Sequence, residues 1–310
     1  MADVVVSEFM DEGAVESLRP EFDVQYDQDL VDRRDELEQA LGAARGLIVR
    51  NRTRVDAALL DAAPDLRVVG RLGVGLDNID LEACRARGVE VCPATGANAV
   101  AVAEYVIAAA MVLVRGVFTA TDRVIAGEWP RQAFVGGEVA GRRMGLVGLG
   151  LIARHVASRA RGLGMDVAAH DPFLPEDHPA WESAEMIDSL DRLLSASDVV
   201  SLHVPLTDDT RGLIGEARLA SLPEGAVLVN TARGGIVEED AVVEALRSGR
   251  LGGAALDVFA DEPVDAASGG RFAGVPNLLL TPHIAGITVE SNVRVSQVTA
   301  DNVRRVLGGE

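Results

Sequence analysis

Three charged or titratable residues each follow a predicted strand in the second half of the chain. Arg233 follows the apolar run AVLVNTA, Glu262 lies in AALDVFADEPV and His283 follows NLLLTP. In a parallel α/β sheet, ligands bind beyond the carboxyl ends of the strands. An arginine can bind a carboxylate through two hydrogen bonds, a histidine can exchange a proton with a hydroxyl or keto oxygen, and an acid can stabilise the imidazolium. The three residue types therefore predict a site that binds a small acid and exchanges a proton with it; a nicotinamide beside them would take or give a hydride.

Each of the three residues also has an ordinary structural interpretation. Arg233 could contact a helix end or a phosphate, and Glu262, which precedes a proline, could lie in a solvated turn. His283 could be a hydrogen-bonded core residue. All three interpretations would have to hold together, so we prefer the catalytic one.

A glycine pattern between a strand and a helix predicts a dinucleotide site. Gly148-x-Gly150-x-x-Ala153 follows the apolar run MGLV. Small residues there permit a tight turn and let backbone N–H groups approach a pyrophosphate at the positive end of a helix. Asp171 ends the next predicted strand, where an acid binds the ribose hydroxyls and repels a 2′-phosphate. We therefore predict NAD and not NADP, with a ligand-free glycine-rich turn as the alternative.

The composition excludes several classes of protein. The formal net charge of -19 disfavours nucleic acid and membrane surfaces as partners, because both are anionic. All 29 basic residues are arginine, which excludes Schiff-base chemistry and a P-loop lysine. Cys84 and Cys92 are too few for a disulfide framework or a Cys-based zinc site, and no metal site is predicted. Neither a signal peptide nor a transmembrane run is visible, so we expect a cytoplasmic protein.

The elements that must position these residues follow an α/β pattern, with a mainly parallel sheet. Predicted strands in the first part of the chain lie at 3–6, 22–26, 46–49, 67–71 and 89–92, with helices such as 31–41 and 55–62 between them. An apolar, buried helix is expected over 98–116. Six further strands are predicted at 144–148, 166–170, 198–203, 226–230, 252–257 and 277–280, the strand count of a doubly wound dinucleotide domain. A last helix over 288–307 is expected to pack back onto the first domain.

Several motifs together resemble the D-isomer-specific 2-hydroxyacid dehydrogenase family. They are GRLGVGLDNID (70–80), VAEYV (102–106), LVGLGLIA (146–153), HDP (170–172), VSLHVPLTDDTRGLI (200–214), NTARGGIVEEDAV (230–242), GAALDVFADEP (253–263) and TPHIAG (281–286). The resemblance covers essentially the whole chain. It implies a Rossmann doubly wound parallel sheet over 98–283, inserted in a discontinuous flavodoxin-like substrate domain formed by 1–97 and 284–310.

The resemblance also implies roles for individual residues. Arg233 would bind the substrate, and Glu262 would be the partner of His283, the acid/base. Val74 and Gly75 would offer backbone N–H groups to the substrate carboxylate. NAD would contact a larger set: Gly148, Gly150, Leu151, Ile152, Asp171, His203, Val204, Pro205, Thr210, Thr231, Ala232, Asp257 and Gly286. Many members have glycine where Ala153 stands, but alanine is also small. The segment from 98 to 134 resembles the family's dimer region, so a homodimer is expected.

Extra arginines in the first domain bear on the substrate. Arg50 and Arg52 follow the third predicted strand, and Arg71 opens the loop that holds Val74 and Gly75. Similar positions bind the distal phosphate in phosphoglycerate dehydrogenases, so the resemblance implies a small anionic hydroxy or keto acid with a second charged group. Simple solvation of Arg50 or Arg52 is the alternative, because arginines are mostly exposed.

Additional motifs resemble the bacterial subgroup that oxidises (S)-3-sulfolactate to 3-sulfopyruvate with NAD. These motifs are SEFMDE, VRNRTRV, GRLGVGLDNID, AGEWPRQA and AHDPFLP. The alternatives are a 3-phosphoglycerate dehydrogenase, disfavoured because no regulatory domain is visible, and a hydroxypyruvate or glyoxylate reductase. A different class of protein, an NAD-sensing co-repressor, shares the fold and the three charged residues.

Overall fold

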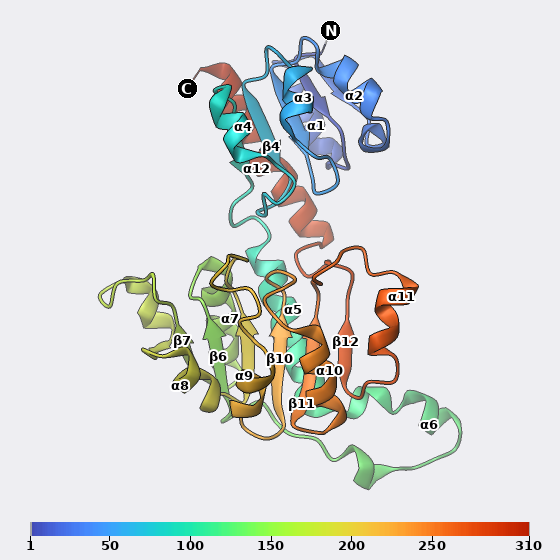
Figure 1. The fold of residues 1–310 in the computed structure, drawn as a ribbon, viewed down its shortest axis with the longest axis vertical. Coiled ribbons are helices and arrows are strands. Elements are labelled where there is room, and N and C mark those ends of the chain that lie inside the picture. Colours follow the sequence, from blue (N-terminus) through green and yellow to red (C-terminus); the bar gives the residue numbers. More distant parts are fainter. Residues whose placement is uncertain (1, 310) are drawn as a thin grey trace. The chain divides into compact units, whose positions relative to one another are not determined.

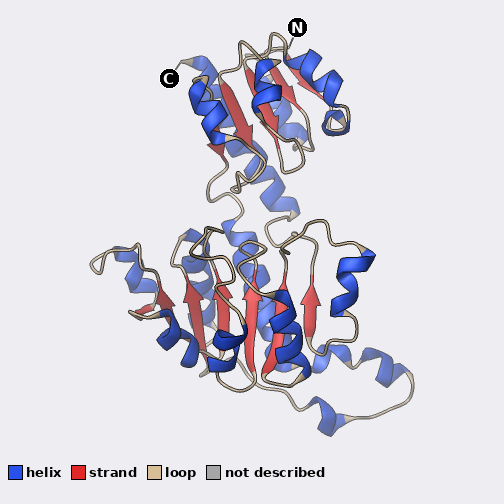
Figure 2. Cartoon of the chain, in the orientation of Figure 1, coloured by secondary structure: helices blue, strands red, loops and turns tan. Residues whose placement is uncertain are grey.

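The computed structural model describes residues 2–309, which divide into two compact units (Figure 1). Unit 1 combines the chain up to Asn98 with the segment from Ile287 onward, and unit 2 is Ala99–Gly286. Each unit is a parallel sheet covered by helices on both faces (Figure 2). The predicted α/β fold class is therefore confirmed.

The sheet of unit 1 has the order β2-β1-β3-β4-β5, which is the flavodoxin-like order. Its strands are Val4–Val6, Val24–Tyr26, Gly46–Val49, Val68–Arg71 and Glu90–Pro93 for β1 to β5. The β-branched run of β1 is fully buried, as expected for a central strand of a parallel sheet. One face packs against α2 to α4, and the other packs against α1 and α12.

Four of the five α-helices of unit 1 begin at residues whose side chains cap them. The five helices are α1 (Glu12–Leu18), α2 (Arg34–Leu41), α3 (Ala57–Asp61), α4 (Leu81–Ala86) and α12 (Val289–Gly308). Asp11, Asp56, Asp80 and Thr288 accept hydrogen bonds from first-turn N–H groups of α1, α3, α4 and α12. The helix predicted over 31–41 was wrong at its start, because a 3-10 turn, Leu30–Asp32, precedes α2 and Arg33 between them leaves the helical conformation.

The C-terminal helix α12 packs against β4 and β5, which makes unit 1 discontinuous in sequence. A Cβ atom at Gly70 would lie 2.8 Å from the side chains of Thr299 and Val303. Glycine at this position therefore lets the helix approach the strand closely.

The sheet of unit 2 has the order β12-β11-β10-β9-β6-β7-β8. Its strands β6 to β12 are Arg143–Val147, Asp166–His170, Glu185–Met186, Val199–Leu202, Ala226–Asn230, Leu251–Leu256 and Leu278–Leu280. The prediction of six strands was wrong by one, because β8 is an exposed two-residue edge strand without an apolar pattern. With β8 included, the order from that edge is the Rossmann order extended by β12.

Helices cover both faces of this sheet. One core joins the strands to α5 (Ala99–Arg115) and α7 (Leu151–Gly162), and another joins them to α8 (Leu190–Ser195), α9 (Glu216–Ser221) and α10 (Glu239–Arg247). The short helices are α6 (Thr121–Ile125), α11 (Ala266–Gly269) and the 3-10 turns Val117–Thr119, Arg131–Phe134, Pro179–Ser183 and Gly270–Phe272. No helix within residues 2–309 is long and apolar enough to cross a lipid bilayer.

Candidate active site

The loop that carries Arg233 begins where β10 ends. The side chain of Asn230 closes this turn: its Oδ1 accepts from the N–H of Ala232 at 3.0 Å, and its Nδ2 donates to the carbonyl of Arg233 at 3.0 Å. A Cβ atom at Gly234 would lie 1.7 Å from the carbonyl oxygen of Phe259. Only glycine therefore allows the Arg233 loop to pack against the segment that leads to Glu262.

Glu262 and His283 are in direct contact. Nδ1 of His283 lies 2.7 Å from Oε2 of Glu262, and Oε1 of Glu262 accepts from the N–H of Phe259 at 2.9 Å. The side chain of His283 is 47% exposed, and that of Glu262 is 34% exposed. Because the carboxylate holds Nδ1, the imidazole can use Nε2 to exchange a proton with a substrate oxygen. The structure thus brings two of the three candidates together and places the Arg233 loop against the chain that carries one of them.

The chain around His283 is held by a buried carboxylate, that of Asp257. Asp257 is 1% exposed; its Oδ1 accepts from the N–H of Ile284 at 2.8 Å and its Oδ2 from the N–H of Ala285 at 2.9 Å. Its carbonyl also accepts from the N–H of His283 at 2.8 Å. His283 has φ of +54°, a left-handed conformation that a non-glycine residue adopts only when its surroundings enforce it. Asp257, predicted as a cofactor contact, therefore also fixes the backbone that carries His283.

Tyr105 extends this network and was not identified from the sequence. Its hydroxyl lies 2.6 Å from Oγ1 of Thr281, which in turn donates to Oδ1 of Asp257 at 2.6 Å. Burial raises the pKa of the Tyr105 phenol. A single tyrosine in the alanine-rich helix α5 was the available signal, because a buried phenol needs a hydrogen-bond partner.

The glycine loop has the geometry of a phosphate-binding turn. Gly148 has φ of +88°, and a Cβ atom there would lie 2.8 Å from the carbonyl oxygen of His203. Gly150 begins α7 without a side-chain cap, and a Cβ atom at this position would meet nothing within 4 Å. The N–H groups of Leu151 and Ile152 lie in the first turn, where they have no intrahelical acceptor, and the open space beside Gly150 leaves room for the pyrophosphate of a dinucleotide.

Asp171 lies just beyond the carboxyl end of β7, next to this turn. Its Oδ2 accepts from the N–H of Leu149 at 2.9 Å, and its Oδ1 accepts from the N–H of Phe173 at 3.1 Å. The acid predicted to bind the ribose therefore also anchors the glycine loop.

The remaining cofactor candidates follow β9, β10 and β12. Burial lowers the pKa of His203 to about 4, so its imidazole is neutral at pH 7, and its Nε2 lies 2.9 Å from Oγ of Ser201. The hydroxyl of Thr231 is buried and has no hydrogen-bond partner within residues 2–309, which fits a polar group supplied by a ligand. The hydroxyl of Thr210 donates to the carbonyl of Pro205 at 2.6 Å and shapes its own loop. Val204 borders Gly148, and Ala232 and Gly286 lie in the segments that carry Arg233 and His283.

In unit 1, Arg71 and the next residues form a turn after β4. Nη1 of Arg71 donates to the carbonyl of Leu72 at 2.8 Å, and a Cβ atom at Gly73 would collide with this guanidinium. Within residues 2–309, the N–H groups of Val74 and Gly75 donate to no protein acceptor. The turn can therefore offer them to a carboxylate.

The structure separates Arg50 from Arg52, which the sequence treated alike. Arg50 is half-buried, and its Nη2 donates to Oδ1 of Asn292 at 2.9 Å. Arg52 is 58% exposed at its side chain and forms an ion pair with Asp32. Solvation, the alternative interpretation, thus describes Arg52 but not Arg50.

A Rossmann sheet with a glycine loop and an acid at the end of the next strand is typical of a dinucleotide-binding domain. The family model described as "D-isomer specific 2-hydroxyacid dehydrogenase, NAD binding domain" matches residues 107–285. The chain belongs to the D-isomer specific 2-hydroxyacid dehydrogenase family and is an NAD-dependent oxidoreductase. The predicted family, cofactor and enzymatic nature are confirmed.

Three relatives show how far the similarity extends. The chain is 56% identical over 308 residues to an (S)-sulfolactate dehydrogenase of Chromohalobacter salexigens, covering 99% of both chains. It is 34% identical to a D-3-phosphoglycerate dehydrogenase of Methanocaldococcus jannaschii, covering 100% of this chain but 58% of that one. The structure of D-lactate dehydrogenase from Aquifex aeolicus, complexed with NAD and lactic acid, has a TM-score of 0.85 and 29% identity, and the match covers 99% of this chain and 96% of that one.

Proposed function

We propose that this dehydrogenase converts (S)-3-sulfolactate to 3-sulfopyruvate. The observation that carries the choice of substrate is the 56% identity to an (S)-sulfolactate dehydrogenase over 99% of both chains. The half-buried guanidinium of Arg50 supports a substrate with an anionic group besides its carboxylate. The stereochemistry agrees, since the sulfonate-bearing carbon outranks the carboxyl group in naming, and (S)-sulfolactate then has the arrangement of a D-hydroxy acid.

In this proposal, unit 1 recognises the substrate and unit 2 binds NAD. The domain boundaries that we propose are those expected from the sequence, 1–97 with 284–310 and 98–283. Arg233 binds the substrate carboxylate with its planar guanidinium. Val74 and Gly75 add backbone N–H groups. The cofactor contacts are proposed for the residues of the glycine loop, Asp171, and the segments after β9, β10, β11 and β12.

The proposed chemistry uses the contact between Glu262 and His283. Nε2 of His283 takes the proton of the substrate hydroxyl, and Glu262 stabilises the imidazolium that forms, 2.7 Å away. NAD, when bound, accepts the hydride from the carbon that carries this hydroxyl. The hydroxyl thus becomes a keto group, and in the reverse direction His283 returns the proton.

A substrate panel tests this proposal. The absorbance of NADH would be followed with sulfopyruvate, hydroxypyruvate, glyoxylate and phosphohydroxypyruvate in parallel. We expect the highest kcat/KM with sulfopyruvate. A higher kcat/KM with phosphohydroxypyruvate would instead support a phosphoglycerate dehydrogenase, and a higher value with hydroxypyruvate or glyoxylate would support a reductase of small keto acids.

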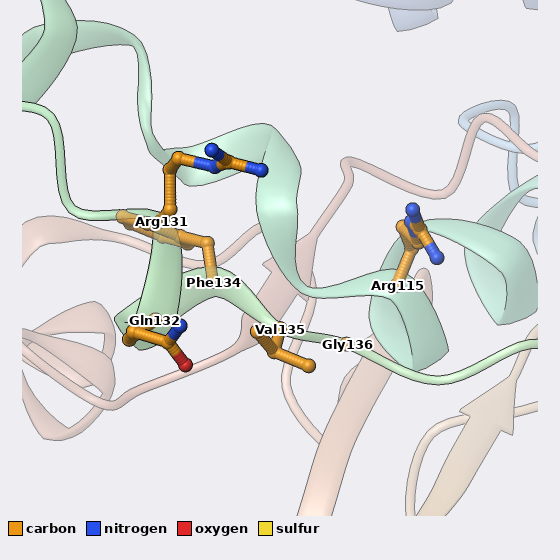
Figure 3. Close-up of a pocket in the computed structure, with 6 residues that line it drawn as sticks. All are labelled: Arg115, Arg131, Gln132, Phe134, Val135 and Gly136. Carbon is orange, nitrogen blue, oxygen red and sulfur yellow. The ribbon is translucent and has the colours of Figure 1, made fainter.

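We further propose a homodimer formed through the segment 117–135 of unit 2. Phe118, Ile125, Trp129 and Val135 in this segment are between 64% and 78% exposed, an apolar surface that suits a protein interface. The segment also borders a hollow of about 430 Å³ lined by Arg115, Arg131, Gln132, Phe134, Val135 and Gly136 (Figure 3). Light scattering should give a dimer for the wild type and a monomer for Trp129→Glu; a wild-type monomer contradicts the proposal. A cytoplasmic location stays a prediction from the sequence.

A further inference from the structure

The loop of residues 50–53, which carries Arg50, is held by one buried carboxylate. Glu8 is 4% exposed and follows β1. Its Oε1 accepts from the N–H groups of Arg50 and Thr53, both at 2.9 Å. Its Oε2 accepts from the N–H groups of Asn51 at 3.3 Å and Arg52 at 3.1 Å. Four consecutive N–H groups thus converge on a single side chain, and the loop backbone has one defined conformation.

The carbonyl side of the same loop is held by Asn78. Its Nδ2 donates to the carbonyl of Thr53 at 2.7 Å and to that of Arg50 at 3.4 Å. The loop therefore has hydrogen-bond partners on both sides: its four N–H groups and the carbonyls of Arg50 and Thr53 are bound without help from the side chains of Arg50 and Arg52.

The side chain of Arg50 is oriented by groups that do not neutralise it. Its Nη2 donates to the amide oxygen of Asn292 on α12 at 2.9 Å, and its guanidinium carbon lies 5.8 Å from the centre of the Phe9 ring. Burial lowers the pKa of Arg50, and the nearby carboxylate of Glu8 opposes this effect. Both carboxylate oxygens of Glu8 accept hydrogen bonds from backbone N–H groups. A neutral amide and an aromatic ring thus hold a cation that keeps its capacity to bind an anion.

Arg52 shows the contrasting arrangement within the same loop. It is paired with the carboxylate of Asp32 at the surface, so an incoming anion would have to compete with a charge already in place.

We propose that Glu8 and Asn292 are positioning residues that hold Arg50 as the determinant for the second anionic group of the substrate. Glu8 fixes where the Arg50 backbone lies, and Asn292 fixes where its guanidinium lies. This inference rests on the proposed function, because it presumes a 2-hydroxy acid with a sulfonate or a comparable second anion.

The test compares two keto acids, sulfopyruvate with two anionic groups and glyoxylate with one. Purified full-length Glu8→Gln and Asn292→Ala would be assayed with both, and the ratio of the two kcat/KM values is the readout. Gln at position 8 turns an N–H group toward backbone donors, and Ala at position 292 removes the acceptor of Arg50. We expect the ratio to fall about tenfold in each variant, mainly through KM for sulfopyruvate, as for the loss of one hydrogen bond to a charged group.

Asn292→Asp provides a sharper variant. A carboxylate at this position would pair with Arg50 and compete with the sulfonate, so the ratio should fall further than in Asn292→Ala. The matched controls are Asn302→Asp, the same charge change on α12, and Glu12→Gln, the same substitution at an exposed position of α1. Both controls should keep the ratio within about twofold of the wild type, a difference small on the scale of one hydrogen bond.

Different outcomes separate the inference from the function on which it rests. A wild type that does not prefer sulfopyruvate overturns the proposed function. An Arg50→Ala variant with an unchanged ratio overturns this inference, because Arg50 would then not recognise the second anionic group, and the proposed function stands. If Arg50→Ala lowers the ratio but Glu8→Gln and Asn292→Ala do not, the positioning role is wrong and the function stands. If Glu8→Gln fails to fold, Asn292→Ala, which leaves the 50–53 backbone contacts intact, decides the question alone.

Discussion

Two loops, one in each unit, are built on the same device. In unit 2 the segment 281–285 is held by Asp257, which directly follows β11, and in unit 1 the segment 50–53 is held by Glu8, which follows β1. Both carboxylates are at most 4% exposed, and both accept hydrogen bonds from consecutive backbone N–H groups. A buried charge is tolerated in each case because several donors solvate it.

The two loops differ in what else is fixed. Asp257 also binds the hydroxyl of Thr281, which is tied to Tyr105, and His283 is held in a left-handed conformation with Glu262 on its ring. Glu8 binds backbone N–H groups and leaves the side chains of its loop to other partners. We infer that the first loop fixes a reacting group, whereas the second fixes a frame on which side chains can vary. Substitutions that disorder the 281–285 loop should lower the rate with every substrate. Substitutions that disorder the 50–53 loop should change which substrate is preferred.

The largest effect is expected from removing the reacting group itself. His283→Ala should lower kcat by about 10²- to 10⁴-fold with every substrate, because it removes the imidazole that is proposed to exchange the proton. The dependence of hydroxy-acid oxidation on pH should disappear as well. Initial rates between pH 5 and 9 would check this; a preserved pH profile would remove His283 as the acid/base.

The next largest effect should come from Asp257→Asn. An amide presents an N–H group toward at least one of the backbone donors, so the loop that carries His283 loses its defined position. We expect kcat to fall about 10- to 100-fold with both sulfopyruvate and glyoxylate, at an unchanged ratio of kcat/KM. Steady-state kinetics on both substrates and NADH binding by fluorescence would separate this from a loss of cofactor affinity. A change confined to NADH affinity would contradict the positioning role.

Acid pH provides a perturbation that acts on unit 2 through His203. The pKa of His203 in the folded state, about 4, lies below the ordinary value of 6.5. Between these two pH values the unfolded chain therefore binds a proton at His203 that the folded chain does not bind. The resulting stability is present above pH 6.5 and is lost as the pH falls toward 4, by up to about 3 kcal/mol. Denaturant unfolding of wild type and His203→Gln at pH 7, 5.5 and 4.5 should show a shallower decline in the variant. If the free energy of unfolding falls equally with pH in both proteins, His203 does not cause the loss of stability.

The smallest effect is expected from Tyr105→Phe, at the far end of the Asp257 network. Thr281 keeps its bond to Asp257, so only one buried hydrogen bond is lost. The free energy of unfolding should fall by about 1 kcal/mol, and kcat should fall less than about fivefold. Urea unfolding and steady-state rates would measure both. A loss of kcat as large as that of Asp257→Asn would mean that the network acts on His283 mainly through Tyr105.

The sequence was sufficient for the features that depend on local patterns. Apolar runs followed by charged residues located the carboxyl ends of the strands, and so placed Arg233, Glu262 and His283. The edge strand β8 was missed because two exposed residues have no periodicity, and the start of α2 was missed because the backbone of Arg33 interrupts an otherwise helical pattern.

The positioning residues could not be found in this way. Glu8 binds N–H groups more than 40 positions along the chain, and Asn292 binds Arg50 across 242 positions. Because Glu8 binds backbone N–H groups, its partners need no particular side chain, so neither a sequence pattern nor a spacing reveals the role of Glu8. Their roles depend on the packing of β1, β3 and α12, which only the folded chain specifies.

The most direct test of the contrast between the two loops is a single experiment on two variants. Values of kcat/KM for sulfopyruvate and glyoxylate would be measured in parallel for wild type, Asp257→Asn and Glu8→Gln. We predict that Asp257→Asn lowers both values by the same factor, whereas Glu8→Gln lowers the value for sulfopyruvate about tenfold more than that for glyoxylate. If both variants lower both values equally, the two loops do not divide reaction from recognition, and the account is wrong.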